Sequence, residues 1–172
     1  MERKHYQEPA CLKAVIDDAQ RNMDSVGVTC FSEVPDSILM WSHYAESHSG
    51  ICVEFDHTDE KSVIAKALPV NYASVYTSVK IFQETPERQF ELFLLTKSDC
   101  WSHEREWRIC HFRGGVGAQQ LPANAIRSIR LGCRMDSSAR DTILAWARQR
   151  KLPALQTKKS SIQYGLEFET IE

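Results

Sequence analysis

The order of short strand-like and helix-like segments constrains the fold of this chain more than any other feature. Strand signals occur at 26–32, 51–55, 105–112 and 126–133, and as two closing strands within 155–171. Helix signals fall between them without strict strand–helix alternation. A mixed order of this kind predicts an α+β fold. We expect a single domain over residues 1–172, with a mixed or antiparallel sheet of about five or six strands and about three or four helices packed on it.

Apolar stripes and capping residues mark the helices. The segments with helical signals are 9–23, 37–48, 59–67, 86–97 and 143–151. Asp36 or Ser37 can cap the second of these helices, and Gly50 is expected to end it. Thr85-Pro86 is a favourable start for the helix at 86–97, because proline fits the first turn. Ser138 and Asp141 form a capping box before the last helix.

Composition excludes several classes of partner. The chain has 21 basic and 23 acidic side chains, so its charge indicates neither duplex nucleic acid nor an anionic membrane as a partner. No apolar stretch has the length of a membrane span, and the N-terminus lacks the apolar core of a signal peptide. The six cysteines are scattered without a Cys-x-x-Cys pair, which is typical of reduced thiols. We therefore predict a cytoplasmic protein.

The segment "CWSHEREWRI" is the strongest candidate for chemistry. In a strand, Glu104 and Glu106 would share a face with Arg108, because side chains two apart point the same way. Two close carboxylates repel, so one of them could keep its proton near neutral pH and act as a general acid or base. In the alternative interpretation, Arg105 and Arg108 neutralise the glutamates in a row of ion pairs.

Histidines supply a second candidate group. His43 lies off the apolar arc of its helix and could hydrogen-bond a ligand, although a histidine bonded to a backbone carbonyl explains the pattern equally well. His48 falls inside the arc and is expected to pack in the core. A metal site built from His43, His48, His103 and Glu104 is not favoured, because the two helical histidines would point about 140° apart. We therefore predict no metal.

Aromatic residues occur in two pairs, Trp41 with Tyr44 and Trp101 with Trp107. Rings of this kind can stack on a nucleobase, but tryptophans more often occupy a core or an interface. Both interpretations stay open from the sequence.

Three stretches carry a family resemblance: "GVTCFSEVPDSILMWSHYAESHSGICVEFD", "CWSHEREWRI" and "IRSIRLGCRM". In order and spacing they resemble the bacterial family called domain of unknown function 2971. The likeness covers about residues 26–170, with 1–25 as an N-terminal helical segment. Members usually carry an upstream segment that "MERKHYQEPACLKAV" does not match. The resemblance therefore implies that a site built partly from that segment would be incomplete here or supplied by another chain.

A more distant likeness concerns chemistry. A Glu-x-Glu strand followed by an apolar residue resembles the last motif of arginine-serine-glutamate ADP-ribosyltransferases. That analogy implies NAD as the cofactor, and no other cofactor is indicated. It makes Glu106 the carboxylate that binds the nicotinamide ribose, Glu104 the residue that activates the acceptor, and Ser32 a supporting serine. Tyr44 or His43 would flank the nicotinamide.

Two functional hypotheses follow. In the first, a bacterial or phage-linked intracellular protein binds a nucleotide in a pocket lined also by Trp41 and Arg108, and transfers or hydrolyses the glycosidic bond of NAD. In the second, the chain is a non-catalytic binding or interaction module, in which Trp41, Trp101 and Trp107 form the core and Arg108 pairs with a glutamate. The second hypothesis implies a protein partner or a homodimer.

Overall fold

The α+β class is confirmed by the computed structural model, which contains both helices and strands in mixed order. Its strands are divided among three sheets, rather than lying in one sheet of five or six. The structure describes residues 13–14, 16–18, 21, 25–60, 62–76, 78, 80, 83–111, 117–118, 120–122 and 124–171.

The first sheet has the strand order β1–β6–β3 and is antiparallel throughout. Its strands are β1 (Gly27–Ser32), β6 (Glu106–His111) and β3 (Leu68–Pro69). The register places Ser32 opposite Glu106 and Cys30 opposite Arg108. Beside this sheet, the short strands β4 (Asn71–Ala73) and β5 (Thr96–Ser98) form a parallel pair.

The second sheet has the order β2–β7–β8–β9. Its strands are β2 (Ile51–Phe55), β7 (Ile126–Leu131), β8 (Ala154–Lys159) and β9 (Leu166–Thr170). β7 and β8 are parallel, and helix α4 (Ser137–Gln149) connects them. Parallel neighbours need such a crossover, because a tight turn can join only antiparallel strands.

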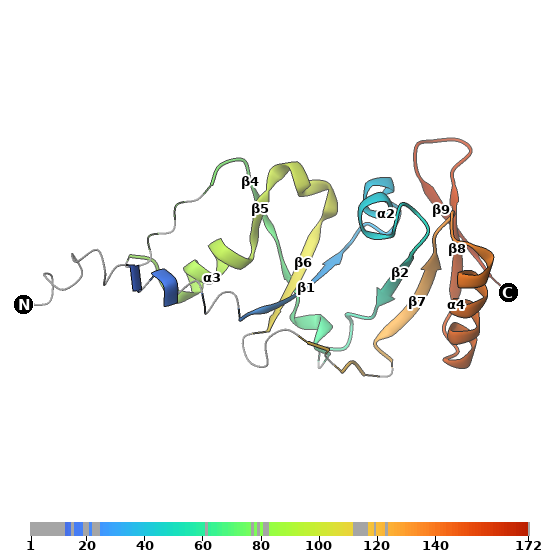
Figure 1. Cartoon of the computed structure of the whole chain (residues 1–172), viewed down its shortest axis with the longest axis horizontal. Coiled ribbons are helices and arrows are strands. Elements are labelled where there is room, and N and C mark those ends of the chain that lie inside the picture. The colour runs from blue at the N-terminus through green and yellow to red at the C-terminus, as the bar shows by residue number, and fades with distance from the viewer. Residues whose placement is uncertain are drawn as a thin grey trace, which may run out of the picture.

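Helices cover both faces of the second sheet. α4 packs on one face through a core of Ile129, Leu131, Leu144, Ala147 and Ala154. Helix α2 (Ile38–Tyr44) packs on the other face, where Trp41 and Ala45 meet Leu166. Figure 1 shows α3 (Pro86–Leu94), β1 and β4–β6 toward the N-terminal end of the molecule, and α2, α4, β2 and β7–β9 toward the C-terminal end.

Several predicted boundaries are confirmed. Ser37 caps α2 by accepting a hydrogen bond from the Met40 N–H, and Thr85 caps α3 with Pro86 at its first position. Strand 51–55 has the predicted bounds, and both closing strands are present. These elements carry strong local signals, because capping side chains and β-branched runs act over a few residues.

Other boundaries were wrong. α2 ends at Tyr44 instead of continuing to Gly50, because Glu46, Ser47 and His48 adopt positive φ angles of 48°, 53° and 72°. Left-handed backbone cannot continue a right-handed helix. The predicted helix 59–67 is reduced to a 3₁₀ helix, η2 (Ile64–Lys66).

The last two helices also differ from their predicted limits. α3 stops at Leu94, so Lys97 lies in β5 rather than at a helix end. Asp136, not Ser138, caps α4, because the Asp136 carboxylate accepts a hydrogen bond from the Ala139 N–H at 2.9 Å. Of the segment 9–23, residues 13–14, 16–18 and 21 are helical, and the other positions lie outside the described residues.

Candidate functional site

The two motif glutamates lie on different elements. Glu104 ends the 3₁₀ helix η3 (Asp99–Glu104), and Glu106 begins β6. Arg105 stands between them in the left-handed conformation, with φ 46° and ψ 56°. The expectation that both glutamates lie on one strand is therefore wrong. They still converge on one cation, Lys97.

Glu104 is buried, with 2% of its surface exposed. Its Oε2 accepts a hydrogen bond from Lys97 Nζ at 2.5 Å, and its Oε1 accepts one from the Tyr44 hydroxyl at 2.8 Å. The carboxylate thus joins α2, β5 and η3. Hydrogen bonding to Glu104 raises the pKa of the Tyr44 hydroxyl, and burial adds to that effect.

Glu106 is held by two cations and is 6% exposed. Arg108 binds it through both oxygens, from Nε to Oε1 at 2.7 Å and from Nη2 to Oε2 at 3.1 Å, and Lys97 Nζ lies 3.0 Å from Oε2. Burial acts to raise the pKa of Glu106, but hydrogen bonds from Arg108, Cys30 and Lys97 outweigh it and lower the pKa to about 2. A raised carboxyl pKa, expected from repulsion between the glutamates, is therefore not found at Glu106.

The ion-pair interpretation of the motif is confirmed for Arg108. Arg105 does not neutralise Glu104 or Glu106, because its guanidinium pairs with Glu33 at 2.5 Å. Arg108 also donates to the Leu94 carbonyl at 2.7 Å, which ties β6 to the end of α3.

Sequence reasoning missed Lys97 and Tyr72. Lys97 bridges Glu104 and Glu106, and its partner in the β4–β5 pair is Tyr72, whose hydroxyl accepts a hydrogen bond from the Glu106 N–H at 2.8 Å. Burial acts to lower the pKa of Lys97, but its hydrogen bonds to the two glutamates outweigh it and raise the pKa. No local pattern marks these residues, because only the pairing of two three-residue strands brings them to the site.

Aromatic rings from α2 and η3 surround the outer side of this network. The His43 and Trp101 ring centroids are 6.1 Å apart in an edge-to-face arrangement, and Trp101 lies 6.0 Å from His103. Lys97 Nζ lies 5.1 Å from the Trp101 centroid, a distance typical of a cation–π contact. Tyr44 remains 61% exposed although Glu104 holds its hydroxyl. We call His43, Tyr44, Trp101 and His103 the aromatic surface.

Two of the predicted site residues form hydrogen bonds with backbone groups. Trp41 is 2% exposed and lies in the core, where its Nε1 donates to the Pro35 carbonyl at 2.6 Å. Ser32 stands opposite Glu106, but its hydroxyl donates to the Glu104 carbonyl at 2.7 Å and accepts from the Val34 N–H at 3.1 Å.

The remaining motif residues lie away from the aromatic surface. Trp107 does not pair with Trp101, because its Nε1 donates to Glu33 at 2.7 Å. His48 is half-buried in the turn after α2, with its Nε2 2.9 Å from the Ser42 hydroxyl oxygen. Among the described residues, no group of three or more His, Cys, Asp or Glu side chains is placed to hold a metal ion.

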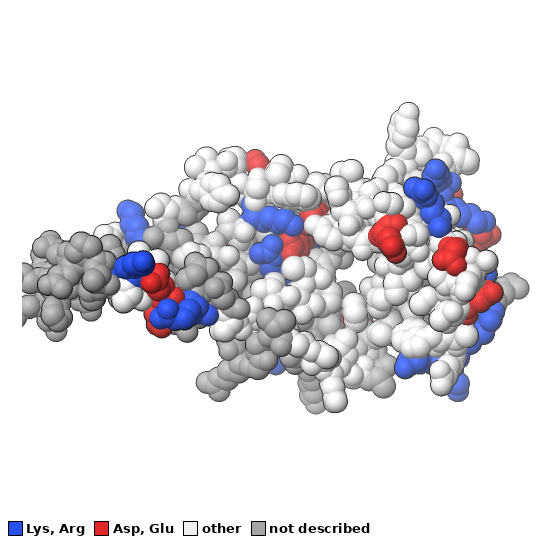
Figure 2. Space-filling view, in the orientation of Figure 1, with Lys and Arg blue, Asp and Glu red and all other residues white. Residues whose placement is uncertain are grey.

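Charged side chains of both signs lie together on one face of the molecule. Figure 2 shows basic and acidic side chains side by side in the middle of the molecule, in the region where Figure 1 places β5 and β6. No helix that the structure describes has the length and apolar content needed to cross a bilayer.

Comparison with known families agrees with the resemblance seen in the sequence. No curated protein and no solved structure matches the chain. Residues 40–109 match the model of one family, Protein of unknown function (DUF2971). That segment contains most of α2, all of β5 and η3 and the start of β6, and therefore the residues of the glutamate network and the aromatic surface. Over this segment, the chain is similar to the DUF2971 family.

Proposed function

We propose that this protein is a ligand-binding module whose Glu106 anchors the fold rather than reacting with a substrate. The proposal rests on the contacts of the Glu106 carboxylate with basic side chains. Both of its oxygens are bound by Arg108, and Lys97 adds a second cation. The negative charge of such a carboxylate is largely neutralised by its two cations, so it would stabilise a cationic sugar in a transition state only weakly.

The aromatic surface supports the choice of ligand. Tyr44 is exposed while its hydroxyl is fixed by Glu104, and Trp101 is fixed by contacts with His43 and Lys97. Trp101 is half-buried. Rings that are partly or fully exposed and held in place lose little conformational entropy when a planar group stacks on them. A nucleobase or a nicotinamide ring fits this chemistry, because stacking tolerates any flat aromatic partner. We infer that the ligand is a nucleotide.

A cytoplasmic location is part of the proposal. Cys30, Cys52, Cys100, Cys110 and Cys133 are all free thiols, as is typical of proteins in a reducing compartment.

The test of binding is calorimetric titration of the protein with NAD. We expect saturable binding that weakens about tenfold when Trp101→Leu removes the stacked ring, since a base–aromatic contact contributes about 1–3 kcal/mol. Tyr164→Phe is the control, because Tyr164 is fully exposed in another part of the chain. Equal affinity for the wild type and Trp101→Leu, or no binding by the wild type, would refute the assignment of this surface.

NAD-dependent transfer or hydrolysis is the second candidate function. One observation favours it: Glu106 is ionised at neutral pH, as the carboxylate of an ADP-ribosyltransferase-like site must be, and it shares Lys97 with Glu104. Glu104 in turn accepts a hydrogen bond from the Tyr44 hydroxyl. Its test is NAD consumption with mass detection of adducts, in the wild type and in Glu106→Gln. Turnover by the wild type that disappears in a folded Glu106→Gln protein would replace the binding-module proposal with this one.

A further inference from the structure

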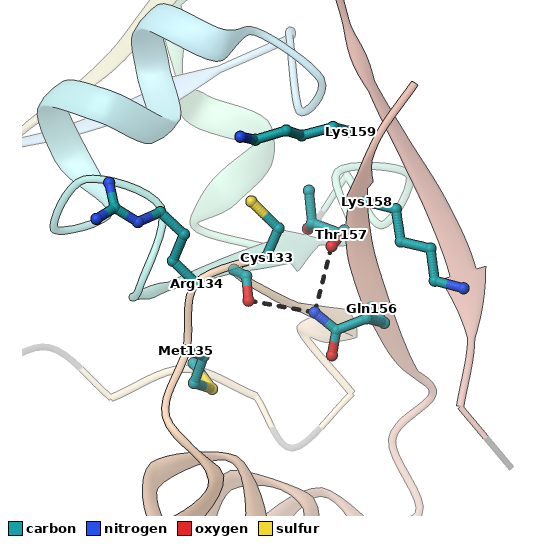
Figure 3. Close-up of a pocket in the computed structure, with 8 residues that line it drawn as sticks. Cys133, Arg134, Met135, Gln156, Thr157, Lys158 and Lys159 are labelled. Carbon is teal, nitrogen blue, oxygen red and sulfur yellow. Dashed lines mark hydrogen bonds between the residues drawn. The ribbon is translucent and has the colours of Figure 1, made fainter. Parts of the chain in front are cut away.

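A cavity of about 540 Å³ opens at one end of the second sheet, away from the glutamate network. Two segments line it: Gly132–Met135, directly after β7, and Gln156–Lys159, the second half of β8. Figure 3 shows these segments facing one another across the cavity. The stretch that carries the two glutamates, residues 100–109, contributes no lining residue, whereas Gly132–Met135 end the stretch "IRSIRLGCRM".

The topology makes this position favourable for a ligand. β7, α4 and β8 form a strand–helix–strand unit with parallel strands. The cavity lies where these strands reach their carboxyl ends, which is the edge at which parallel α/β sheets bind ligands. α4 has 13 residues and begins at Ser137, just after the lining loop. The start of such a helix favours a negative charge nearby, because its first N–H groups point outward.

The charged side chains at the cavity are basic. Figure 3 shows Arg134 and Lys159 extending to the same side of the loop as the Cys133 sulfur, whereas Lys158 extends the other way. Lys158 pairs with Glu169. Among the ion pairs found in the described part of the chain, neither Arg134 nor Lys159 takes part in one. Two cations facing one cavity without an internal counter-ion attract an anion.

A buried hydroxyl points to a missing partner. Thr157 lines the cavity and is only 1% exposed. Its Oγ1 is buried and has no hydrogen-bond partner among the described residues. Buried polar atoms in folded proteins are almost always hydrogen-bonded, and the exceptions need an explanation such as a bound ligand. A phosphate oxygen would supply the acceptor that this hydroxyl lacks.

The loop is fixed in place before any ligand arrives. Gly132 N–H donates to the Gly50 carbonyl at 2.9 Å, and Arg134 N–H donates to the His48 carbonyl at 3.0 Å. On the other side, Gln156 Nε2 donates to the Gly132 carbonyl at 3.2 Å and to the Thr157 carbonyl at 3.3 Å (Figure 3). A site that is already ordered binds without a large entropic cost.

We propose that this cavity binds the phosphate group of a small phosphorylated molecule, through Arg134, Lys159 and the Thr157 hydroxyl. A phosphate matches the planar guanidinium of arginine and accepts hydrogen bonds from several donors at once. The site is separate from the aromatic surface and does not depend on the function proposed for it.

The test is calorimetric titration with inorganic pyrophosphate at low ionic strength. The wild type is expected to bind saturably, and Arg134→Ala and Lys159→Ala to weaken binding about tenfold each, a loss of about 1.4 kcal/mol. Lys158→Ala is the matched control, because this lysine lines the same cavity but extends away from it and pairs with Glu169. Arg134, Lys158 and Lys159 all lie in the lining segments. Thermal unfolding of each variant shows whether it is still folded, so that a loss of binding can be separated from a loss of structure.

Thr157→Val separates a ligand contact from a structural one. Valine has nearly the shape of threonine, and the Thr157 Oγ1 makes no hydrogen bond within the described protein, so folding stability should not fall. Binding should weaken severalfold, because the phosphate loses a donor. The proposal is overturned if the wild type does not bind, if Lys158→Ala weakens binding as much as Lys159→Ala, or if Thr157→Val binds like the wild type.

Discussion

Lys97 determines how the two motif glutamates are arranged. Its ammonium group lies 2.5 Å from Glu104 and 3.0 Å from Glu106, and both carboxylates are almost fully buried. Without this cation, the Glu104 carboxylate would keep, among the described residues, only the hydrogen bond from Tyr44, and one negative charge would be buried without compensation. The network therefore depends on a residue that no motif includes.

Replacing Lys97 should destabilise the protein strongly. We expect Lys97→Met to lower the free energy of unfolding by about 3 kcal/mol, the usual cost of removing one partner from a buried ion pair. Urea unfolding followed by tryptophan fluorescence measures this. Lys158→Met is the control, since the Lys158–Glu169 pair is more than half exposed and should contribute less than about 1 kcal/mol. Equal effects of the two substitutions would contradict the role given to Lys97.

Glu106 should also make stability depend on pH. Its pKa is about 2 in the folded protein, below the ordinary value of 4.5, so the unfolded chain binds a proton at a higher pH than the folded chain does. The stabilisation from Glu106 is therefore complete above about pH 5 and is lost as the pH falls toward 2.

The measurement is the free energy of unfolding of the wild type and of Glu106→Gln across this acid range. The wild type should lose more stability than the variant as the pH falls, and the two curves should approach each other at the acid end. Parallel curves would show that Glu106 has an ordinary pKa in the folded protein.

At the scale of elements, α2 and the turn that follows it contact both halves of the molecule. Tyr44, at the end of α2, reaches Glu104 beside the first sheet. The His48 carbonyl, in the turn, accepts a hydrogen bond from the Arg134 N–H at the edge of the second sheet. The left-handed residues after Tyr44 make this possible, because they end the helix early and turn the backbone toward Gly132.

Gly132 is required by this contact. A Cβ atom at Gly132 would lie 2.1 Å from the His48 carbonyl oxygen, a clash with backbone that no rotamer can relieve. We expect Gly132→Ala to lower the midpoint temperature of unfolding by several degrees, equivalent to about 2 kcal/mol. Gly165→Ala is the matched control, because its nearest neighbour, Gln163 Cγ, is 4.0 Å away. An unchanged midpoint for Gly132→Ala would contradict the close approach of the two loops.

The sequence predicted correctly those elements whose causes lie within a few residues, and it missed those that depend on distant parts of the chain. The caps at Ser37 and Thr85 were found because a cap is set by a side chain within a few residues of the helix start. β4 and β5 were missed because each has three residues and exists only through its pairing with the other. Lys97 was placed in a helix for this reason, and its contact with both glutamates could not be foreseen.

The same reasoning explains the candidate site. Glu104, Glu106 and Arg108 were expected together from their spacing, and they are together. The spacing could not reveal the left-handed Arg105 or the burial of Trp41. It also gave no sign of the cavity at the end of β7, because the lining segments are more than twenty residues apart in sequence.

For the whole molecule, the structure separates two chemical environments. Beside the first sheet, buried glutamates pair with Lys97 and Arg108 beneath the aromatic surface. In the second sheet, a cavity with basic side chains lies at the ends of the parallel strands. α2 packs on the second sheet while contacting the network of the first. The family match to residues 40–109 covers the network and α2 but not the cavity. We propose that the network holds these parts together.

A double-mutant cycle between Glu106 and Arg108 tests that claim most directly. The free energies of unfolding of the wild type, Glu106→Gln, Arg108→Gln and the double variant give the coupling energy of the pair. An anchoring ion pair at 6% exposure predicts a coupling of about 2–3 kcal/mol. A coupling near zero, with all four proteins folded, would show that Glu106 does not stabilise the fold through Arg108 and would contradict its role as an anchor.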